Sequence, residues 1–242
     1  MKHSFIPFFL MLVVYGNAQQ ILIPAATAFD KKWIHNDSSR LDWFVFADTT
    51  PRKIGEVITR TRISNDRILV ITQVELKGRP GTWIDSTIAE QKTGKPIYHS
   101  SYNAQRNMVL EFGNTVNGYY YDKQKDSTIK IADAVKQDYF DSNIYPQLVG
   151  WLPLKEGYQQ DIAIYDFNPK NKSGVLWASV KGVATGSVET KLSGKREVWI
   201  VTVTDQISST STNTYYFDKK DRRLWKQEIQ TTSGKMMMLR QE

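Results

Sequence analysis

The side chains best suited to chemistry are sparse in this sequence. Its 242 residues contain three histidines and no cysteine. His99 lies in a strand-like run, and no carboxylate or second histidine stands near it at the spacing of metal ligands. We therefore interpret His99 as a strand histidine with an ordinary polar partner. The sequence predicts no metal site and no cofactor.

The acids and hydroxyls give no catalytic pattern either. Ser86 follows Asp85 but lacks the glycine elbow that would expose a nucleophile. Asp122 and Asp126 flank a turn without the ligand ladder of a calcium loop. A hydrolase acting on sugars or peptides would have to use exposed carboxylates such as Asp85 and Glu111, and it is the least favoured class of function. No catalytic residue is predicted.

The first 18 residues have the pattern of an export signal. Lys2 and His3 precede an apolar run from Phe5 to Tyr15, and the small residue Ala18 follows. The run is shorter than the ~20 residues that a membrane-spanning helix needs. The sequence thus predicts cleavage after Ala18 and a periplasmic or secreted protein. Without a cysteine, it predicts no lipid attachment at that site.

Period-two alternation of β-branched and aromatic residues dominates the mature chain, residues 19–242, which we interpret as a single β-rich domain. Asn65-Asp66 is a pair suited to a tight hairpin turn, and Gly182 and Gly186 interrupt a strand pattern as a bulge or bend would. The predicted fold class is mainly β, one strongly curved antiparallel sheet in a half-barrel meander. The predicted strands are 40–48, 54–64, 67–76, 82–90, 96–102, 108–112, 116–122, 127–133, 160–167, 175–190, 196–205, 208–218, 224–232 and 235–241.

The period changes between Gln137 and Tyr158, where apolar residues recur at helical intervals. Pro146 lies inside this segment and Pro153 ends it, so we expect two short helical pieces, with a kink, against the concave side of the sheet. Side chains this apolar must bury against the sheet, a ligand or both. The predicted ligand-binding residues are therefore Phe140, Ile144, Leu148, Trp151 and Leu152.

Aromatic and basic residues allow two further expectations. Most of the seven tryptophans and twelve tyrosines are expected in the core or in cross-strand pairs. The alternative is that a minority of them line a cavity for an apolar ligand. The net charge is +7, but the basic residues are scattered, and the densest group, Lys219–Arg223, contains Asp221. A nucleic-acid surface would be a basic stripe interleaved with aromatics, so we expect no nucleic-acid partner. We expect instead a solvated basic surface with peripheral contact to an anionic envelope.

Six segments share a pattern: 95–105, 140–141, 152–158, the Val180/Gly182 bend, the turn at Gly194 and 215–225. Together they resemble an exported family of unknown function from Gram-negative envelopes. The resemblance covers residues from about Thr59 to the end and carries no catalytic residue. That family is similar in architecture to the Lol-type periplasmic lipoprotein carriers, whose curved half-barrel is covered by helices on a concave, lipid-binding side. The resemblance implies the fold, and it implies lipid binding only by analogy.

Three hypotheses of function follow. The first is a protein that binds an apolar envelope molecule, a lipid or an acyl chain, between sheet and helices. The second is a structural or interaction module of the envelope with a filled core and no ligand. The third is the hydrolase. A cavity beneath 140–151 would separate the first two, and the sequence sets neither the ligand nor the oligomeric state.

Overall fold

The structure is a computed structural model that describes residues 20–208 and 210–242. The predicted signal segment and its cleavage site lie outside these residues. The described strands all belong to one sheet of fifteen strands, in the order β8-β7-β6-β5-β4-β3-β2-β1-β15-β14-β13-β12-β11-β10-β9. Every neighbouring pair is antiparallel except β9 and β10, which are parallel. The prediction of a mainly antiparallel curved sheet with a helix on its concave side is therefore confirmed.

The N-terminal half of the sheet is a meander of eight strands. Its first hairpin turn is at Asp48, and its second contains Asn65 and Asp66, both at positive φ (50° and 58°), as the pair predicts. The strands are β1 (Asp37–Ala47), β2 (Thr50–Ser64), β3 (Arg67–Leu76), β4 (Trp83–Glu90), β5 (Pro96–Tyr102), β6 (Arg106–Glu111), β7 (Thr115–Asp122) and β8 (Ser127–Ala134).

The C-terminal half is a second meander that returns to the first. The expected irregularity at Gly182 is confirmed, because the pairing of β11 with β12 shifts between Val180 and Gly182. The elements are β9 (Phe140–Asp141), α1 (Tyr145–Trp151), β10 (Gln160–Asp166), β11 (Gly174–Thr190), β12 (Gly194–Asp205), β13 (Thr212–Asp218), β14 (Leu224–Thr231) and β15 (Gly234–Arg240). A short 3-10 helix, η1 (Lys31–Trp33), precedes β1.

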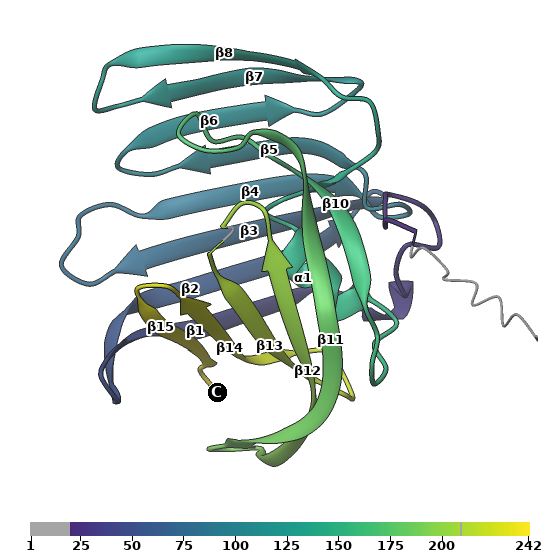
Figure 1. Ribbon diagram of the computed structural model, residues 1–242, viewed down its shortest axis with the longest axis vertical. Helices are drawn as coiled ribbons and strands as arrows, with labels where there is room; N and C mark the ends of the chain where they lie inside the picture. The colour runs from purple at the N-terminus through teal and green to yellow at the C-terminus, as the bar shows by residue number, and fades with distance from the viewer. Residues whose placement is uncertain (1–19, 209) are drawn as a thin grey trace, which may run out of the picture.

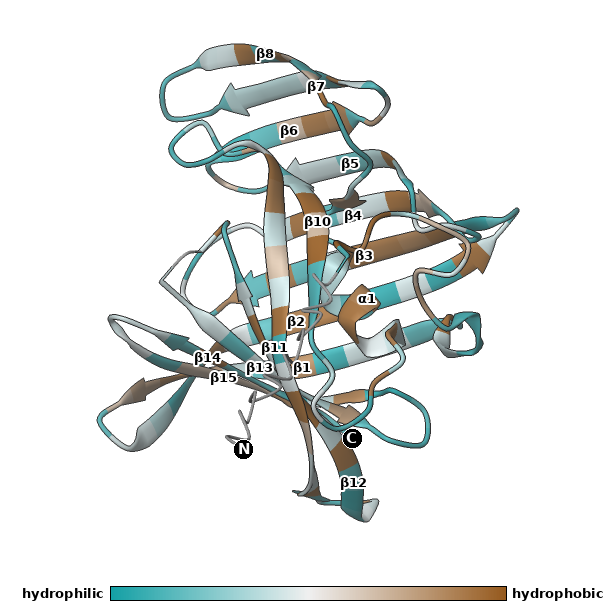
Figure 2. Ribbon diagram, turned by 45° about the vertical axis from the view of Figure 1, so that its right-hand side comes forward, coloured by the Kyte–Doolittle hydropathy of each residue, from teal (hydrophilic) through white to brown (hydrophobic). Residues whose placement is uncertain are grey.

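The two halves face each other, and α1 lies between them. β1 pairs with β15 in the middle of the sheet, so the sheet folds over and its last strands cross in front of its first (Figure 1). Figure 2 shows hydrophobic residues gathered on α1, β3 and β10. Side chains from all three elements form one core cluster. The far end of β10 packs against β6–β8 through a second cluster that contains Tyr165.

The central helical segment differs from its prediction. It forms one helix rather than two pieces, because Pro146 occupies the first turn, where a missing backbone N–H costs nothing. The residues before it, Phe140–Asp141, are extended and pair with Ile164 and Tyr165 of β10. Phe140 therefore matches the helical spacing although it lies in β9, before α1 begins at Tyr145.

Polar and backbone contacts hold α1 in place. The hydroxyl of Tyr145 donates to Oδ2 of Asp205 at 2.6 Å, at the end of β12. The backbone N–H of Asp30 donates to the carbonyl of Trp151 at 3.0 Å, so the segment before η1 closes the other end of the helix. Leu22 forms a parallel bridge with Ile162 and so extends the pairing along the edge of β10 that β9 also uses. Within the part of the chain that the structure describes, no helix combines the length and apolar character needed to cross a membrane.

One face of α1 is a structural anchor, and truncation on that face should be costly. Leu148 is 1% exposed and fully packed, so Leu148→Ala should lower the free energy of unfolding by about 2–5 kcal/mol, measured by urea denaturation. Gln147, the preceding helical residue, is only partly buried, and Gln147→Ala should cost below about 1 kcal/mol. Equal losses from the two variants would contradict this placement of the helix.

Candidate functional site

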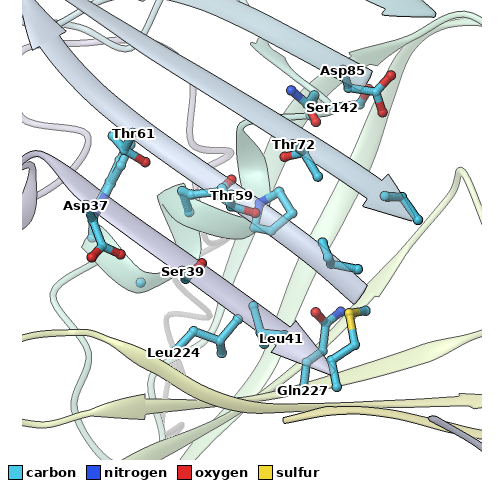
Figure 3. Close-up of a pocket in the computed structure, with 18 of the residues that line it drawn as sticks. Asp37, Ser39, Leu41, Thr59, Thr61, Thr72, Asp85, Ser142, Leu224 and Gln227 are labelled. Carbon is cyan, nitrogen blue, oxygen red and sulfur yellow. The ribbon is translucent and has the colours of Figure 1, made fainter. Parts of the chain in front are cut away.

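A cavity of about 590 Å³ lies between the two halves of the sheet. Its floor is the concave face of β1–β4, one side is α1, and the opposite side is formed by the ends of β13–β15. Every one of these elements is required, since the lining comes from residues between Trp33 and Arg240 that only the folded-over sheet brings together. Figure 3 shows part of the lining.

The floor carries two parallel rows of side chains in cross-strand register. Alternate residues of a strand share a face, and paired residues of neighbouring strands lie side by side, so each row runs across the strands. With strands about 4.8 Å apart, a row over four strands spans roughly 14 Å. The polar row, labelled in full in Figure 3, is Ser39, Thr59, Thr72 and Asp85. The apolar row is Leu41, Val57, Val74 and Trp83.

Aromatic side chains form much of the remaining wall. Trp151 of α1 contacts Phe29 with ring centroids 5.9 Å apart, so one side of this indole is packed while the residue also borders the cavity. Trp83 is 38% exposed and donates its indole N–H to Asp85 at 2.7 Å. The aromatic lining residues are Trp33, Trp43, Trp83, Trp151, Phe167 and Phe217.

One end of the cavity contains a buried histidine–carboxylate pair. Nδ1 of His99 on β5 lies 2.8 Å from Oδ2 of Asp141 on β9, and both side chains are almost fully buried. Thr87 donates to the same carboxylate, and Asn143 donates to the Thr87 hydroxyl at 2.9 Å. Nε2 of His99 has no hydrogen-bond partner among the described residues, and His99 lines the cavity. The pair therefore lies at the edge of the cavity and leaves one ring nitrogen of His99 buried without a partner among the described residues.

Charge and burial shift the pKa values of His99 and Asp166 at this end of the cavity. Burial lowers the pKa of His99, but the charge of Asp141 and its hydrogen bond, with Asp85 and Asp166 nearby, outweigh burial and leave the pKa raised. Burial raises the pKa of Asp166, which the 2.8 Å hydrogen bond from Ser142 opposes only in part. In Figure 3, Ser142 and Asp85 lie together at this end.

The other end of the cavity is basic. Arg222 follows β13 and lies over two indoles, 4.7 Å from the centroid of Trp33 and 5.7 Å from that of Trp199. Its Nε and Nη1 atoms are buried and have no hydrogen-bond partner among the described residues. Burial lowers the pKa of Arg222 to about 10, although the charge of Asp30 acts in the opposite direction. Arg223 and Arg240 also line this end.

The arrangement fits an organic ligand better than a metal ion. Across residues 20–208 and 210–242, no cluster of three or more histidine or acidic side chains has the geometry of a metal site. The cavity instead offers a row of hydroxyls beside a row of aliphatic side chains, with charged groups at its two ends. Such a lining can bind a molecule that has both apolar and polar parts.

Residues 40–240 match the family described as "Protein of unknown function (DUF3108)". The chain belongs to the DUF3108 family. No curated protein matches the sequence. The matched region begins in β1 and ends in β15, so it contains both meanders, α1 and nearly all of the cavity lining. Trp33 lies before the matched region, whereas Arg222 and Trp199 lie inside it.

Within this DUF3108 member, the five predicted ligand-binding side chains fall into two groups. Trp151 borders the cavity. The other four are at most 1% exposed, belong to the main core cluster and do not line the cavity: Phe140, Ile144, Leu148 and Leu152. Their apolar spacing therefore reports the packed face of the helical segment, while the face bearing Pro146, Gln147 and Gly150 meets the cavity.

Sequence reasoning missed most of the polar lining. The expected partner of His99 is Asp141, 42 residues away, and no local pattern signals a pairing between β5 and β9. Arg222 was included in a basic group expected to be a solvated surface, but its guanidinium lies inside, against two tryptophans. Only the polar row had a signal in the sequence. When the predicted strands 54–64 and 67–76 are paired as a hairpin through the Asn65-Asp66 turn, Thr59 falls beside Thr72.

The histidine–carboxylate pair should make stability depend on pH. A raised pKa of His99 means that the stabilisation is complete below the unfolded value of about 6.5 and is lost as pH rises through the folded value. In His99→Asn the amide can still donate to Asp141. Asn does not titrate, so the difference in unfolding free energy between parent and variant should shrink over the range above about pH 6.5, measured by urea denaturation. A difference that stays constant over this range would contradict the assignment.

Proposed function

We propose that this protein is an exported envelope protein that binds an apolar or amphipathic small molecule, with a lipid or acyl chain as the expected class. The ligand occupies the cavity between the two halves of the sheet. Its hydrocarbon part lies along the apolar row from Leu41 to Trp83, and its polar atoms face the polar row from Ser39 to Asp85.

The observation that carries this proposal is the pair of adjacent rows on the cavity floor. A side-chain-filled core would bury apolar residues from both facing layers, as happens around Leu148 and Ile164. At Thr59 and Thr72 the floor is instead polar and faces a space of about 590 Å³. This volume falls within the range of about 300–1,000 Å³ that is usual for small-molecule sites.

The alternative is a structural or interaction module without a ligand. It is favoured by the packing of Phe140, Ile144, Leu148 and Leu152, which makes α1 part of the core. The two functions differ in one respect that can be measured, since only the binding protein needs the cavity to remain open.

Filling the cavity should abolish binding and leave the fold intact. Thr59 lies on the cavity floor, and Thr59→Trp places a bulky ring there. Uptake of an apolar fluorescent probe, or of lipid detected by native mass spectrometry, should fall at least about tenfold. The free energy of unfolding should change by less than about 1 kcal/mol, because an aromatic residue is well tolerated in a strand.

A matched control is the neighbouring position. Arg60 points to the opposite face of β2, so Arg60→Trp adds the same ring outside the cavity and should leave uptake unchanged. Uptake that is absent in the parent protein would remove the binding function and leave the structural module. Uptake that survives Thr59→Trp would place the ligand elsewhere.

The envelope location is part of the proposal and has its own test. It is supported by the charged start, short apolar run and small residue that end at Ala18. N-terminal sequencing of the protein recovered from the periplasm or medium should begin at Gln19. Recovery of mature protein that still begins at Met1 would overturn the exported location without affecting the cavity.

A further inference from the structure

We infer that the basic end of the cavity is an anion subsite, in which Arg222 binds the carboxylate or phosphate group of the ligand. The inference rests on the proposed function and narrows it, from an amphipathic molecule to an amphipathic anion. Three features of Arg222 support this inference: the groups that contact its guanidinium, the charges near that guanidinium and the turn in which Arg222 lies.

The guanidinium is held in position while leaving hydrogen-bond donors unused. Trp33 and Trp199 lie against it at 4.7 and 5.7 Å, and such cation–π contacts restrict the plane of the group without satisfying its N–H bonds. Nε and Nη1 are buried and have no partner among the described residues. Guanidinium groups bind carboxylates and phosphates strongly, and here neither a counter-ion nor a complete set of hydrogen bonds satisfies the group.

The charges at this end leave Arg222 without a counter-ion. Arg223 lies 3.9 Å from Asp221, and Arg240 lies 3.8 Å from Asp37. Among the residues that the structure describes, no carboxylate lies within 4.0 Å of Arg222, and Lys219 brings another positive charge to 4.6 Å from the Trp199 ring. Asp30 acts on Arg222 only at longer range, since its carboxylate pairs with Lys32 at 2.8 Å.

The turn that carries Arg222 is built around a buried carboxylate. Asp218 is 2% exposed, and its Oδ2 accepts from the guanidinium of Arg196 and from the indole of Trp225, each at 2.8 Å. Its Oδ1 accepts from the backbone of Lys220, and its carbonyl accepts from the backbone N–H of Arg222 at 3.0 Å. Arg222 itself has φ of 60°, a conformation that side-chain-bearing residues seldom adopt. The turn is therefore fixed independently of the guanidinium that it directs inward.

Apolar lining next to this turn indicates an alkyl chain behind the anionic group. Leu224 follows the turn directly, and Leu41, Leu224 and Gln227 lie near one another in the cavity (Figure 3). An inorganic anion would leave these aliphatic surfaces unused. A fatty-acid-like carboxylate or an alkyl phosphate would use both the guanidinium and the apolar row.

The test compares ligands that share one tail and differ in charge. The delipidated full mature chain is titrated by calorimetry with decanoate, decyl phosphate, decyl maltoside and decyltrimethylammonium, each below its micelle concentration. The two anions should bind most tightly, and the stronger of the two identifies carboxylate or phosphate. Arg222→Met should weaken anion binding about ten- to a hundredfold and leave decyl maltoside binding unchanged.

Lys220→Met is the matched control, since it removes one positive charge from the same turn at an exposed residue that does not line the cavity. It should leave anion binding nearly unchanged. The thermal midpoint of Arg222→Met should be equal to or above that of the parent, because the variant removes a buried cation without a counter-ion. A lowered midpoint with equal loss of all four ligands would instead identify Arg222 as a structural clamp.

The outcomes separate this inference from the proposed function. If all four probes bind with similar affinity and Arg222→Met changes none of them, the cavity binds ligand and the anion subsite is wrong. If inorganic phosphate or acetate binds through Arg222 while no decyl compound binds, the anion subsite stands and the apolar-ligand function is wrong. If no probe or small anion binds, both are wrong.

Discussion

The pairing of the first and last strands is the constraint on which the rest of this structure depends. β1 and β15 lie at the centre of the sheet, with Leu41 opposite Arg240 and Val45 opposite Met236. This pairing turns two meanders into one sheet that folds over α1. It also places residues from both ends of the chain on the same cavity, since Leu41 and Trp43 of β1 and Met238 and Arg240 of β15 all line it. Neither meander alone encloses that space.

The fold was largely predictable because strand periodicity and turn chemistry are local. Fourteen predicted strands correspond to strands of the structure, and the Asn65-Asp66 turn and the Gly182 irregularity occur where their residue types indicate. The strand that was missed, Phe140–Asp141, has two residues and so shows no alternation. The helix was placed correctly, but Pro146 begins it rather than kinking it, a distinction that depends on where the backbone hydrogen bonds start.

The candidate site was much less predictable because its residues meet only through long-range contacts. The apolar spacing of Phe140, Ile144 and Leu148 identified a buried face, but spacing cannot distinguish a face buried against protein from one buried against a ligand. The polar groups of the site come from separate strands and turns. His99 and Asp141, and likewise Trp33 and Arg222, are brought together by the folding of the sheet, so neither pair has a sequence signature.

The central position of β1 and β15 also determines how the chain can fold. Most other strand pairs join neighbours along the chain and can form as local hairpins, whereas Leu41 and Arg240 are separated by almost the whole described sequence. Closing so large a loop is slow and comes after local pairing. Until β15 arrives, β1 has one unpaired edge, and such an edge invites pairing with other chains. A chain synthesised from its N-terminus therefore cannot complete this sheet until β15 has been made, which makes the interval before closure the period in which this protein is most exposed to aggregation.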